Sequence, residues 1–257
     1  ERHGKSLVIT MSRPKANAID AAMSRTLHAA YDKLQKDDGL LCGILMSALP
    51  RIFCAGYDLK LQAEESWDLD LDNDPVHGFG PGGFAGIADN RTLDKPVIAA
   101  VHGAVVGGGF EMILACDIII AAADSYFMLP ETQRGLLPDV GGWQRLPRMI
   151  PPMVAIELML TGRRMEADEA RHWGLVHKIV PRERLKEEAL AIGASIAKGA
   201  PLAVRALKAI LRETRHVSLK EALARGKVLA SGVPVYERMM ASEDFVEGPR
   251  AFAEKRD

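Results

Sequence analysis

The sequence predicts an α/β fold, and three observations lead to that class. Short apolar runs with strand character alternate with segments whose apolar residues recur at helical spacing. Two glycine-rich turns, at 103–109 and 135–142, each lead into a segment of helix-forming residues. Beyond Arg182 the strand signals stop and only helical patterns remain. We therefore expect an α/β core over 1–181 and a helical C-terminal region over 182–257.

The N-terminal elements follow from the spacing of apolar residues. The run 6–11 predicts a strand that ends before Arg13 and its proline neighbour. Apolar residues at helical spacing predict a helix over 21–36, with Asp20 as a candidate N-cap that accepts a hydrogen bond from the first turn. The run 41–46 is apolar on both faces, which favours a strand buried inside a sheet.

The second half of the chain continues the alternation and then becomes helical. Strands are expected at 96–101, where Pro96 suits the first position, and at 176–180. An apolar stripe on the later helices, with Leu207 and Leu211 as examples, indicates packing within the chain or between subunits. Helices are predicted at 87–93, 152–160, 167–173, 187–197, 202–212 and 219–229.

Composition excludes several function classes. The 257 residues carry a formal net charge of −1, so there is no basic footprint for nucleic acid or for a membrane surface. No apolar run approaches the length of a membrane span, and the N-terminal stretch does not have a signal-peptide pattern. Cys42, Cys54 and Cys116 lie far apart with no ligand spacing, so we expect buried thiols, no metal site and a reducing, cytoplasmic location.

The stretch 103–131 carries the most chemical information. The glycine run that ends at Gly109 leads into a helix-forming segment, which brings free N–H groups and the positive end of a helix dipole close to a ligand. Glu111 lies in the first turn of that segment, and Glu131 follows twenty positions later. Two carboxylates that converge beside a backbone anion site can move protons next to a developing oxyanion. The alternative is that Glu111 is an ordinary first-turn acid and Glu131 a surface loop residue.

Two further segments are candidates for ligand contact. Gly56 separates an apolar run from a helix start at Asp58, which indicates either a turn with exposed N–H groups or a plain loop. The segment 62–84 is first acidic and then glycine-rich, and it predicts a mobile surface flap. Phe79 and Phe84 are the residues with which such a flap would close over a ligand, the alternative being a solvated loop.

These motifs, taken in order, identify a family. The chain reads Phe-Cys-Ala-Gly-Tyr-Asp-Leu over 53–59 and Lys-Pro-Val-Ile-Ala-Ala-Val-His-Gly over 95–103 before the glycine run and Glu111. It continues with Leu-Pro-Glu over 129–131 and Gly-Gly-Trp-Gln-Arg-Leu-Pro over 141–147. Over nearly its whole length the sequence resembles the crotonase superfamily, also called the enoyl-CoA hydratase/isomerase family.

The resemblance implies a fold and a substrate class. Members of this family have a core of repeated ββα turns that form a spiral, and a C-terminal helical region that builds trimers or a dimer of trimers. The implied substrate is an acyl-CoA thioester, with no metal and no cofactor apart from the CoA that enters as part of the substrate. Neither a nucleic acid nor a membrane is implied as a partner.

The resemblance also implies roles for residues. Glu111 would activate water as the base in hydration and Glu131 would protonate the α-carbon, with both roles reversed in dehydration. The N–H groups of Tyr57 and Gly108 would form the oxyanion hole for the thioester carbonyl. Residues implied to bind the substrate are Ala55, Asp58, Leu59, Lys60, Phe84, Pro130, Asp139 and Trp143.

Indications for the acyl group come from other stretches of the chain than those for the reaction. The stretches 13–20, 80–86 and 247–257 resemble family members that act on the crotonobetainyl-CoA/carnitinyl-CoA pair. However, Trp143 stands where many hydratases carry a smaller residue, and Tyr57 where short-chain hydratases often have alanine. Both differences reshape the predicted acyl pocket. Asp139 is expected either to touch a polar substrate group or to cap the helix that begins near Gly141.

Two other functions remain as alternatives. One is a general short-chain enoyl-CoA hydratase or isomerase on the same scaffold. The other is a scaffold without turnover that binds CoA thioesters or RNA, although RNA binding would require a basic face. Retention of both Glu111 and Glu131 favours hydratase chemistry over family members that keep only one of these acids, and it argues against a scaffold without turnover. Comparing the turnover of crotonobetainyl-CoA with that of crotonyl-CoA tests the first alternative.

Overall fold

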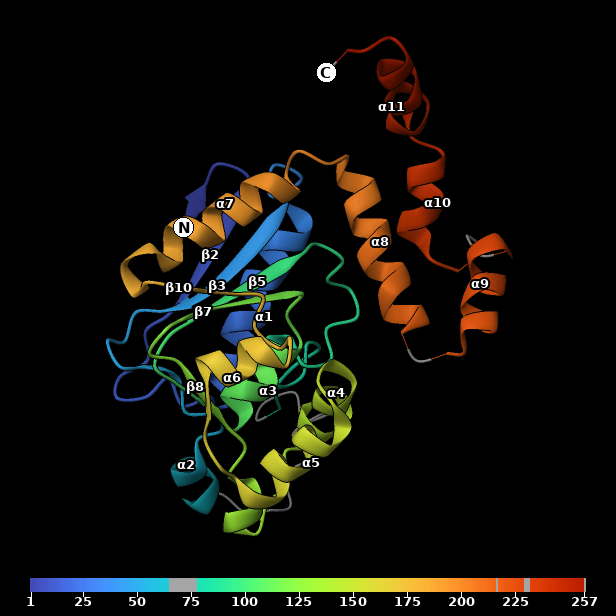
Figure 1. Ribbon diagram of the computed structural model, residues 1–257. Helices are drawn as coiled ribbons and strands as arrows, with labels where there is room; N and C mark the ends of the chain where they lie inside the picture. The colour runs from blue at the N-terminus through green and yellow to red at the C-terminus, as the bar shows by residue number, and fades with distance from the viewer. Residues whose placement is uncertain (65–77, 216, 229–231, 257) are drawn as a thin grey trace.

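The structure is a computed structural model that describes residues 1–64, 78–215, 217–228 and 232–256 (Figure 1). These residues form one six-stranded and one four-stranded sheet. The first consists of β1 (Arg2–His3), β2 (Ser6–Met11), β3 (Cys42–Ser47), β5 (Val97–Val101), β7 (Ile118–Ala122) and β10 (Lys178–Val180), in that order. Apart from β1, which is antiparallel to β2, neighbouring strands in this sheet are parallel.

Both faces of the large sheet are covered by helices. Ile9 and Leu45 belong to a core cluster that includes Leu27 of helix α1 (Ala21–Lys36). Val8 and Ile44 belong to a second cluster that includes residues of helix α7 (Leu185–Ile196). Since successive strand residues point to opposite faces, the continuous apolar runs are explained by burial on both sides.

The small sheet contains β4 (Ile52–Cys54), β6 (Ala104–Val106), β8 (Tyr126–Met128) and β9 (Met165–Glu166). Strands β4, β6 and β8 each follow a strand of the large sheet directly and pair in parallel with one another. A helix then follows: α2 (Leu59–Glu64) after β4, α3 (Gly108–Leu114) after β6, and the 3-10 turn η2 (Glu131–Arg134) after β8. The chain thus repeats a ββα unit, as predicted, and the ends of the second strands converge on one region.

The predicted helices are found with small differences in their ends, except at 87–93. Asp20 is the N-cap of α1, where its side chain accepts a hydrogen bond from the Met23 N–H at 2.7 Å. Gly162 ends α5 in the left-handed conformation with φ 62°. The remaining helical elements are η1 (Phe84–Gly86), α4 (Gly142–Met149), α5 (Pro152–Thr161), α6 (Ala167–His172), η3 (Arg182–Arg184), α8 (Pro201–Thr214), α9 (Leu219–Val228), α10 (Pro234–Met240) and α11 (Glu243–Ala253).

The helix predicted at 87–93 is wrong, because this segment consists of turns. The Asn90 side chain donates to the Gly86 carbonyl at 3.1 Å and accepts from the Leu93 N–H at 3.2 Å. An asparagine side chain that bonds to nearby backbone in this way replaces the hydrogen bonds that a helix would make.

The predicted mobile flap over 62–84 is also wrong for residues 78–84, while 65–77 lie outside the described residues. Arg25 of α1 donates to the Gly78 carbonyl at 2.7 Å, and the Ala85 N–H donates to the Ser24 hydroxyl at 3.0 Å. Phe84 is buried, with only 2% of its surface exposed. This segment is therefore packed against α1 as part of the core.

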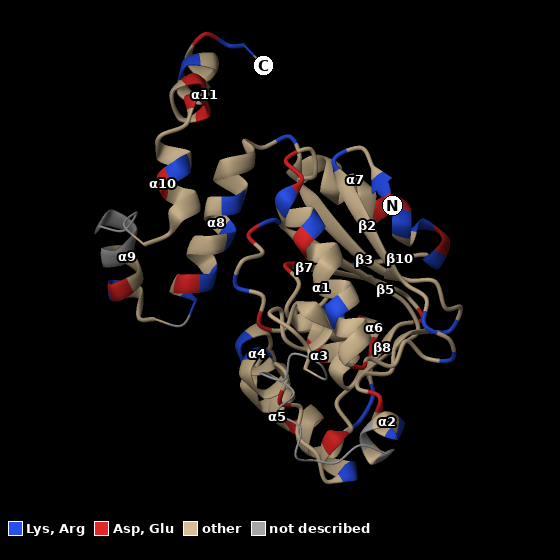
Figure 2. Ribbon diagram, turned by 180° about the vertical axis from the view of Figure 1, so that it is seen from behind, with Lys and Arg blue, Asp and Glu red and all other residues tan. Residues whose placement is uncertain are grey.

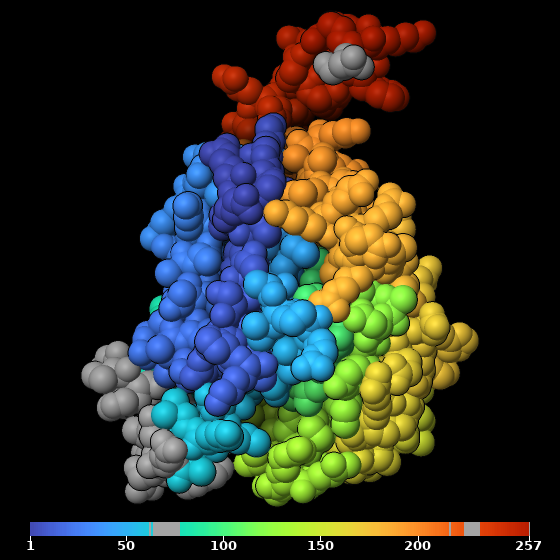
Figure 3. Space-filling view, turned by 90° about the vertical axis from the view of Figure 1, so that its left-hand side faces the viewer, coloured from blue at the N-terminus to red at the C-terminus, as the bar shows by residue number. Residues whose placement is uncertain are grey.

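The C-terminal helices extend beyond the sheets. In Figures 1 and 3, α11 projects away from the rest of the molecule, whereas Val235 of α10 packs in one buried cluster with Ala206 and Ala209 of α8. Helix α8 is joined to the core by Arg205, which forms a buried, two-bond ion pair with Asp94 at 2.7 and 3.1 Å. Lys208 adds bonds of 2.8 Å to Asp117 and to the Lys95 carbonyl. The division at residue 181 stays a prediction, and α7 beyond it packs on the large sheet.

No single helix among the described residues is both long enough and apolar enough to cross a membrane. The segments 182–196 and 201–214 pass that test only together, and they are bent by 103° at the break between them.

Candidate active site

The turn between β6 and α3 is built on glycine. Gly107 has φ 56°, and a Cβ atom added to it would lie 2.9 Å from Oε1 of Glu131. A Cβ atom at Gly108 would lie 2.6 Å from the Phe84 ring. Gly108 is the first residue of α3, so no preceding helical turn offers an acceptor for its N–H. The glycines thus allow other groups to approach the backbone of the helix start.

A second glycine turn meets the first. Gly56 has φ 90°, and a Cβ atom there would lie only 2.7 Å from the Gly108 nitrogen and 2.8 Å from the Val106 oxygen. The nitrogen of Tyr57 is 3.4 Å from the position of a Cβ atom on Gly108. The structure therefore brings the two residues predicted for the oxyanion hole together, by close contact of two backbone turns.

Arg13 supports the wall of the site on the Tyr57 side. Its Nη2 atom lies 2.9 Å from an Oδ2 of Asp20 and 2.9 Å from an Oδ2 of Asp58. Ile19 forms a parallel bridge with Tyr57, in which the Ile19 N–H donates to Gly56 and the Asp58 N–H donates to Ile19. This cluster fixes the backbone on both sides of Tyr57.

Glu111 projects from the first turn of α3 and is 2% exposed. Its Oε1 atom accepts a hydrogen bond of 2.8 Å from the N–H of Gly142, the first residue of α4. Burial raises the pKa of Glu111 to about 8, the Gly142 bond opposes that shift, and the charges of Glu131 and Asp139 add to it. The shift favours the protonated form of this carboxyl group and brings its proton exchange close to neutral pH.

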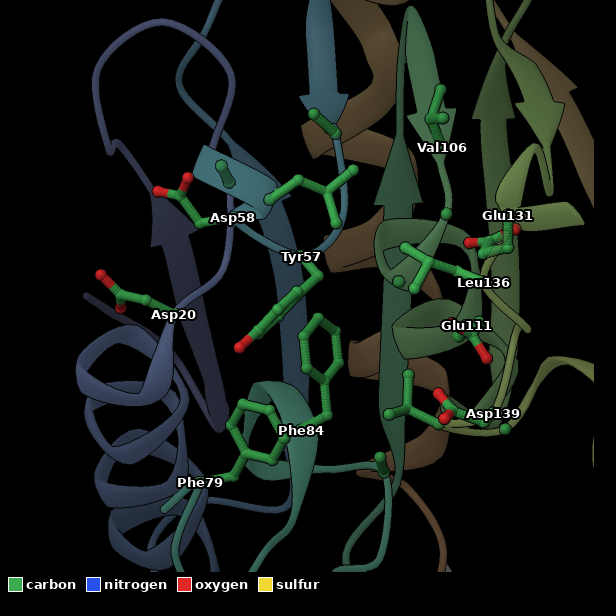
Figure 4. A pocket seen from close by; sticks show the side chains of 18 of the residues that line it. Asp20, Tyr57, Asp58, Phe79, Phe84, Val106, Glu111, Glu131, Leu136 and Asp139 are labelled. Atoms are coloured by element: carbon green, nitrogen blue, oxygen red, sulfur yellow. The ribbon is translucent and has the colours of Figure 1, made fainter. Parts of the chain in front are cut away.

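Glu131 begins η2, directly after the Leu-Pro step that follows β8. Its Oε2 atom is buried and has no hydrogen-bond partner among the described residues. Burial raises the pKa of Glu131 above its usual value, while the nearby Arg134 charge opposes the shift. In Figure 4 the two carboxylates come from α3 and η2 and lie on the same side of the pocket.

These groups line a cavity of about 1920 Å³. Figure 4 shows Asp139 beside Glu111 on one side and the rings of Tyr57, Phe79 and Phe84 on the other. The cavity is lined by both predicted oxyanion residues, both glutamates, and the predicted substrate-binding residues Ala55, Asp58, Leu59, Lys60, Phe84, Pro130 and Asp139.

Trp143 is not brought into the cavity. Its side chain is 55% exposed, and it is absent from the cavity lining, although Gly142 before it and Gln144 after it are close to the site. Successive residues of a helix point about 100° apart, so a helix that aims the Gly142 N–H at Glu111 turns the next side chain away. The structure gives no support to a pocket role for Trp143 within one chain.

The aromatic residues of the predicted flap form a fixed cluster. The rings of Phe79 and Phe84 are 5.4 Å apart at 88°, and Tyr57 is 6.0 Å from Phe79 and 6.1 Å from Phe84. Edge contacts of this kind are the favoured packing of aromatic rings. Phe79 and Phe84 thus belong to the cavity wall and the core without any ligand bound.

Sequence reasoning missed several contributors to the site. The sequence indicates Gly142 only as part of a turn and Arg13 only as part of a motif. Arg145 of α4 also lines the cavity and donates to the Ala88 carbonyl at 2.5 Å. The signal for Gly142 was present in the glycine pair before α4, since free N–H groups at a helix start attract a carboxylate.

Comparison with known proteins adds an independent finding. The model of the family described as "Enoyl-CoA hydratase/isomerase" matches residues 1–257. A carnitinyl-CoA dehydratase of Citrobacter koseri is 44% identical over 100% of this chain and 95% of its own length. The carnitinyl-CoA dehydratase of Proteus mirabilis is 46% identical over 98% and 94% of the two chains.

Solved structures agree with this result. The crystal structure of an enoyl-CoA hydratase from Mycobacterium tuberculosis H37Rv has a TM-score of 0.85 at 40% identity, covering 100% of this chain and 95% of the other. That of an enoyl-CoA hydratase from Bacillus anthracis has a TM-score of 0.82 at 34% identity, covering 100% and 95%. The predicted resemblance and fold class are confirmed: this chain belongs to the enoyl-CoA hydratase/isomerase family.

Proposed function

We propose that the substrate pair of this hydro-lyase is crotonobetainyl-CoA and carnitinyl-CoA. The relatives described as carnitinyl-CoA dehydratases share 44–46% of their residues with this chain over nearly its full length, whereas the two enoyl-CoA hydratase structures described above share 34–40%. The difference supports a betaine-type acyl group over a simple short-chain one. The reaction is the reversible addition of water to the α,β double bond of the thioester.

The observation that carries the proposed mechanism is the position of two carboxylates beside two converging backbone turns. We assign the N–H groups of Gly108 and Tyr57 to the thioester oxygen. Hydrogen bonds at that oxygen stabilise the enolate-like charge that develops when the α-carbon gains or loses a proton, and one such donor is typically worth about 3 kcal/mol. The close contact of Gly56 with Gly108 supports this assignment.

The glutamates divide the proton transfers. In hydration, Glu111 takes a proton from water as the water attacks the β-carbon, and Glu131 gives a proton to the α-carbon. In dehydration, Glu131 takes the α-proton and Glu111 protonates the departing hydroxide. In either direction, one of the two glutamates must be protonated and the other ionised before the reaction begins. These groups supply the proton transfers and the carbonyl polarisation, so the proposed reaction requires no cofactor other than the CoA of the substrate.

A comparison of two substrates tests the proposal. The purified protein is expected to hydrate crotonobetainyl-CoA with a kcat/KM above that for crotonyl-CoA. A preference for crotonyl-CoA would instead support the general short-chain hydratase, and double-bond migration without addition of water would support the isomerase. Absence of turnover with both, with retained binding of acyl-CoA, would support a scaffold without catalysis.

The proposed assembly is a homotrimer or a dimer of trimers. The C-terminal helices carry large apolar side chains that are exposed in the single chain, and burial of such surface drives subunit association. These residues are Leu207 and Leu211 on α8, Leu219 and Leu223 on α9, and Phe245, Val246 and Phe252 on α11.

Figure 2 shows acidic and basic residues interspersed in the ribbon, which gives no support to a nucleic-acid partner. The buried free thiols of Cys42, Cys54 and Cys116 support a reducing, cytoplasmic location.

A further inference from the structure

Asp139 lies in the turn before α4 and is exposed toward the cavity. Its backbone is held, because its N–H donates to the Leu137 carbonyl at 3.0 Å and its own carbonyl accepts from Gln144 at 2.9 Å. Its carboxylate makes no hydrogen bond or ion pair within the described part of the chain. The N-cap of α4 is Gly141, without a side-chain cap bond, so Asp139 is not the cap of this helix.

The position of Asp139 is electrostatically unfavourable for the empty site. Its charge raises the pKa of both Glu111 and Glu131. Arg145 donates to the Ala88 carbonyl and Arg134 to the Pro130 carbonyl, and the Arg134 charge only partly offsets the raised pKa of Glu131. No ion pair joins either arginine to these three acids within the described ranges. A ligand that brings a positive charge to this wall would therefore be bound more tightly than a neutral one.

The proposed substrate carries such a charge at a defined place. Its trimethylammonium group is attached to the carbon next to the β-carbon, and the β-carbon must lie within reach of Glu111 for water to be added. The ammonium group must then lie near Glu111, and Figure 4 shows the Asp139 carboxylate beside Glu111, whose pKa it affects. A trimethylammonium group has no N–H, so it requires a charge rather than a hydrogen-bond partner.

Resting on the proposed function, we propose that Asp139 is a specificity-determining residue that attracts the trimethylammonium group of a betaine-type acyl-CoA. The cavity wall opposite Asp139 is made by the rings of Tyr57, Phe79 and Phe84, which offer apolar surface to the acyl part of the substrate. A neutral acyl chain fits the same space but gains nothing from the Asp139 charge.

The first test measures affinity without catalysis. The probes are the saturated thioester 4-trimethylammoniobutanoyl-CoA and its carbon isostere, in which a quaternary carbon replaces the ammonium nitrogen. Asp139→Asn is expected to raise the Kd of the cationic thioester about tenfold, which is the effect expected for loss of one charge contact at a partly exposed site. The Kd of the carbon isostere is expected to change by no more than about twofold. Equal changes for both probes, or no change for either, would overturn the assignment.

The matched control is Asp89→Asn. Asp89 also lines the cavity but pairs with Arg91 at 3.1 Å, so its substitution removes the same charge without touching the proposed subsite. This variant is expected to keep the preference for the cationic probe. Loss of that preference in Asp89→Asn to the same degree as in Asp139→Asn would show a general field effect and would contradict a specific role for Asp139.

Measurements of turnover distinguish failure of the proposed role of Asp139 from failure of the proposed function on which that role rests. If the unaltered protein hydrates crotonobetainyl-CoA and its unsaturated carbon isostere, and Asp139→Asn lowers kcat/KM for both equally, the proposed function stands and the role of Asp139 fails. If the unaltered protein hydrates only the neutral isostere, the betaine substrate and the role of Asp139 fail together. The expected result is a loss of about tenfold confined to the cationic substrate.

Discussion

The N–H of Gly142 donates a hydrogen bond of 2.8 Å to Oε1 of Glu111. This contact joins the start of α4 to the first turn of α3, and it places the positive end of a second helix dipole beside a buried carboxyl group. The bond stabilises the ionised form, but burial outweighs it, and the pKa of Glu111 remains at about 8. The acid is thus poised to hold and to release a proton near neutral pH.

The first prediction concerns the dependence of activity on pH. The charged groups around Glu111 are Glu131 from η2, Asp139 from the turn before α4, and Arg145 on α4. Because the glutamate pair must hold one proton, kcat/KM should follow a bell-shaped curve whose alkaline limb lies near the Glu111 pKa of about 8. Above that pH both acids are ionised and no proton remains for the α-carbon.

The same alkaline limb is expected for hydration and for dehydration, since the overall reaction neither takes up nor releases protons. Initial rates in both directions between pH 5 and pH 10 measure it. A kcat/KM that still rises above pH 9 would contradict the shared-proton account.

The second prediction concerns the contact between the two glycine turns. Gly56→Ala places a Cβ atom 2.7 Å from the Gly108 nitrogen and should separate the proposed oxyanion donors. We expect kcat to fall about a hundredfold, as for loss of one donor. Gly174→Ala is the matched control. Gly174 also has a positive φ (80°, compared with 90° at Gly56), but no atom lies within 4 Å of a Cβ atom added to it. Equal activity of the two variants would remove the contact from the mechanism.

The third prediction assigns a positioning role to Arg13, which bridges Asp20 and Asp58 next to Tyr57. Arg13→Gln should lower kcat about tenfold, because small displacements of a positioned group reduce rates strongly. The Kd of a saturated acyl-CoA should change little. Arg91→Gln, which removes an exposed ion pair at the cavity, is the control. If Arg13→Gln raised Kd and left kcat unchanged, Arg13 would instead bind the substrate.

The fourth prediction concerns assembly. Light scattering should give a mass near three or six times 28.0 kDa at micromolar concentration. Leu223→Glu should lower that mass, because Leu223 on α9 is 60% exposed in the single chain and belongs to the apolar surface proposed to be buried between subunits. Lys220→Glu on the same helix changes charge without removing apolar surface and is the control. A monomeric native protein would contradict the proposed assembly.

Much of the fold is predictable because its signals are local. The helix over 21–36 has an N-cap at Asp20 and a regular apolar stripe, and both are found. The buried strands are recognisable from continuous apolar runs. The glycine turn before Glu111 is likewise encoded in adjacent residues, since a positive φ at Gly107 and close contacts at Gly108 exclude larger side chains.

The errors arise where one side chain or a distant contact decides the structure. The segment 87–93 has helical composition, but Asn90 bonds to Gly86 and Leu93 and makes turns. The glycines and phenylalanines of 78–84 suggest mobility, yet α1 provides partners for Gly78 and Ala85. A hydrogen bond between residues 53 or 61 positions apart has no signature in either segment alone.

The site likewise contains some features that local sequence predicts and others that only the folded chain reveals. Glu111 and Glu131 are recognisable as a pair because each follows a characteristic turn, at a helix start and after a Leu-Pro step. The direction of Trp143 depends on how α4 is rotated by the Gly142 contact, which the sequence around it does not specify. The bridge from Arg13 to Asp58 joins two loops 45 residues apart and emerges only from the folded chain.

The most direct test of the central claim is the turnover of Glu111→Gln and Glu131→Gln with crotonobetainyl-CoA and crotonyl-CoA, measured together with the Kd of a saturated acyl-CoA. Glutamine keeps the size of each side chain and removes its ability to exchange a proton. Each variant should lose about a hundredfold or more in kcat, the contribution typical of one acid–base group, with little change in Kd. Turnover near that of the unaltered protein in either variant would contradict the assignment of that glutamate to the reaction.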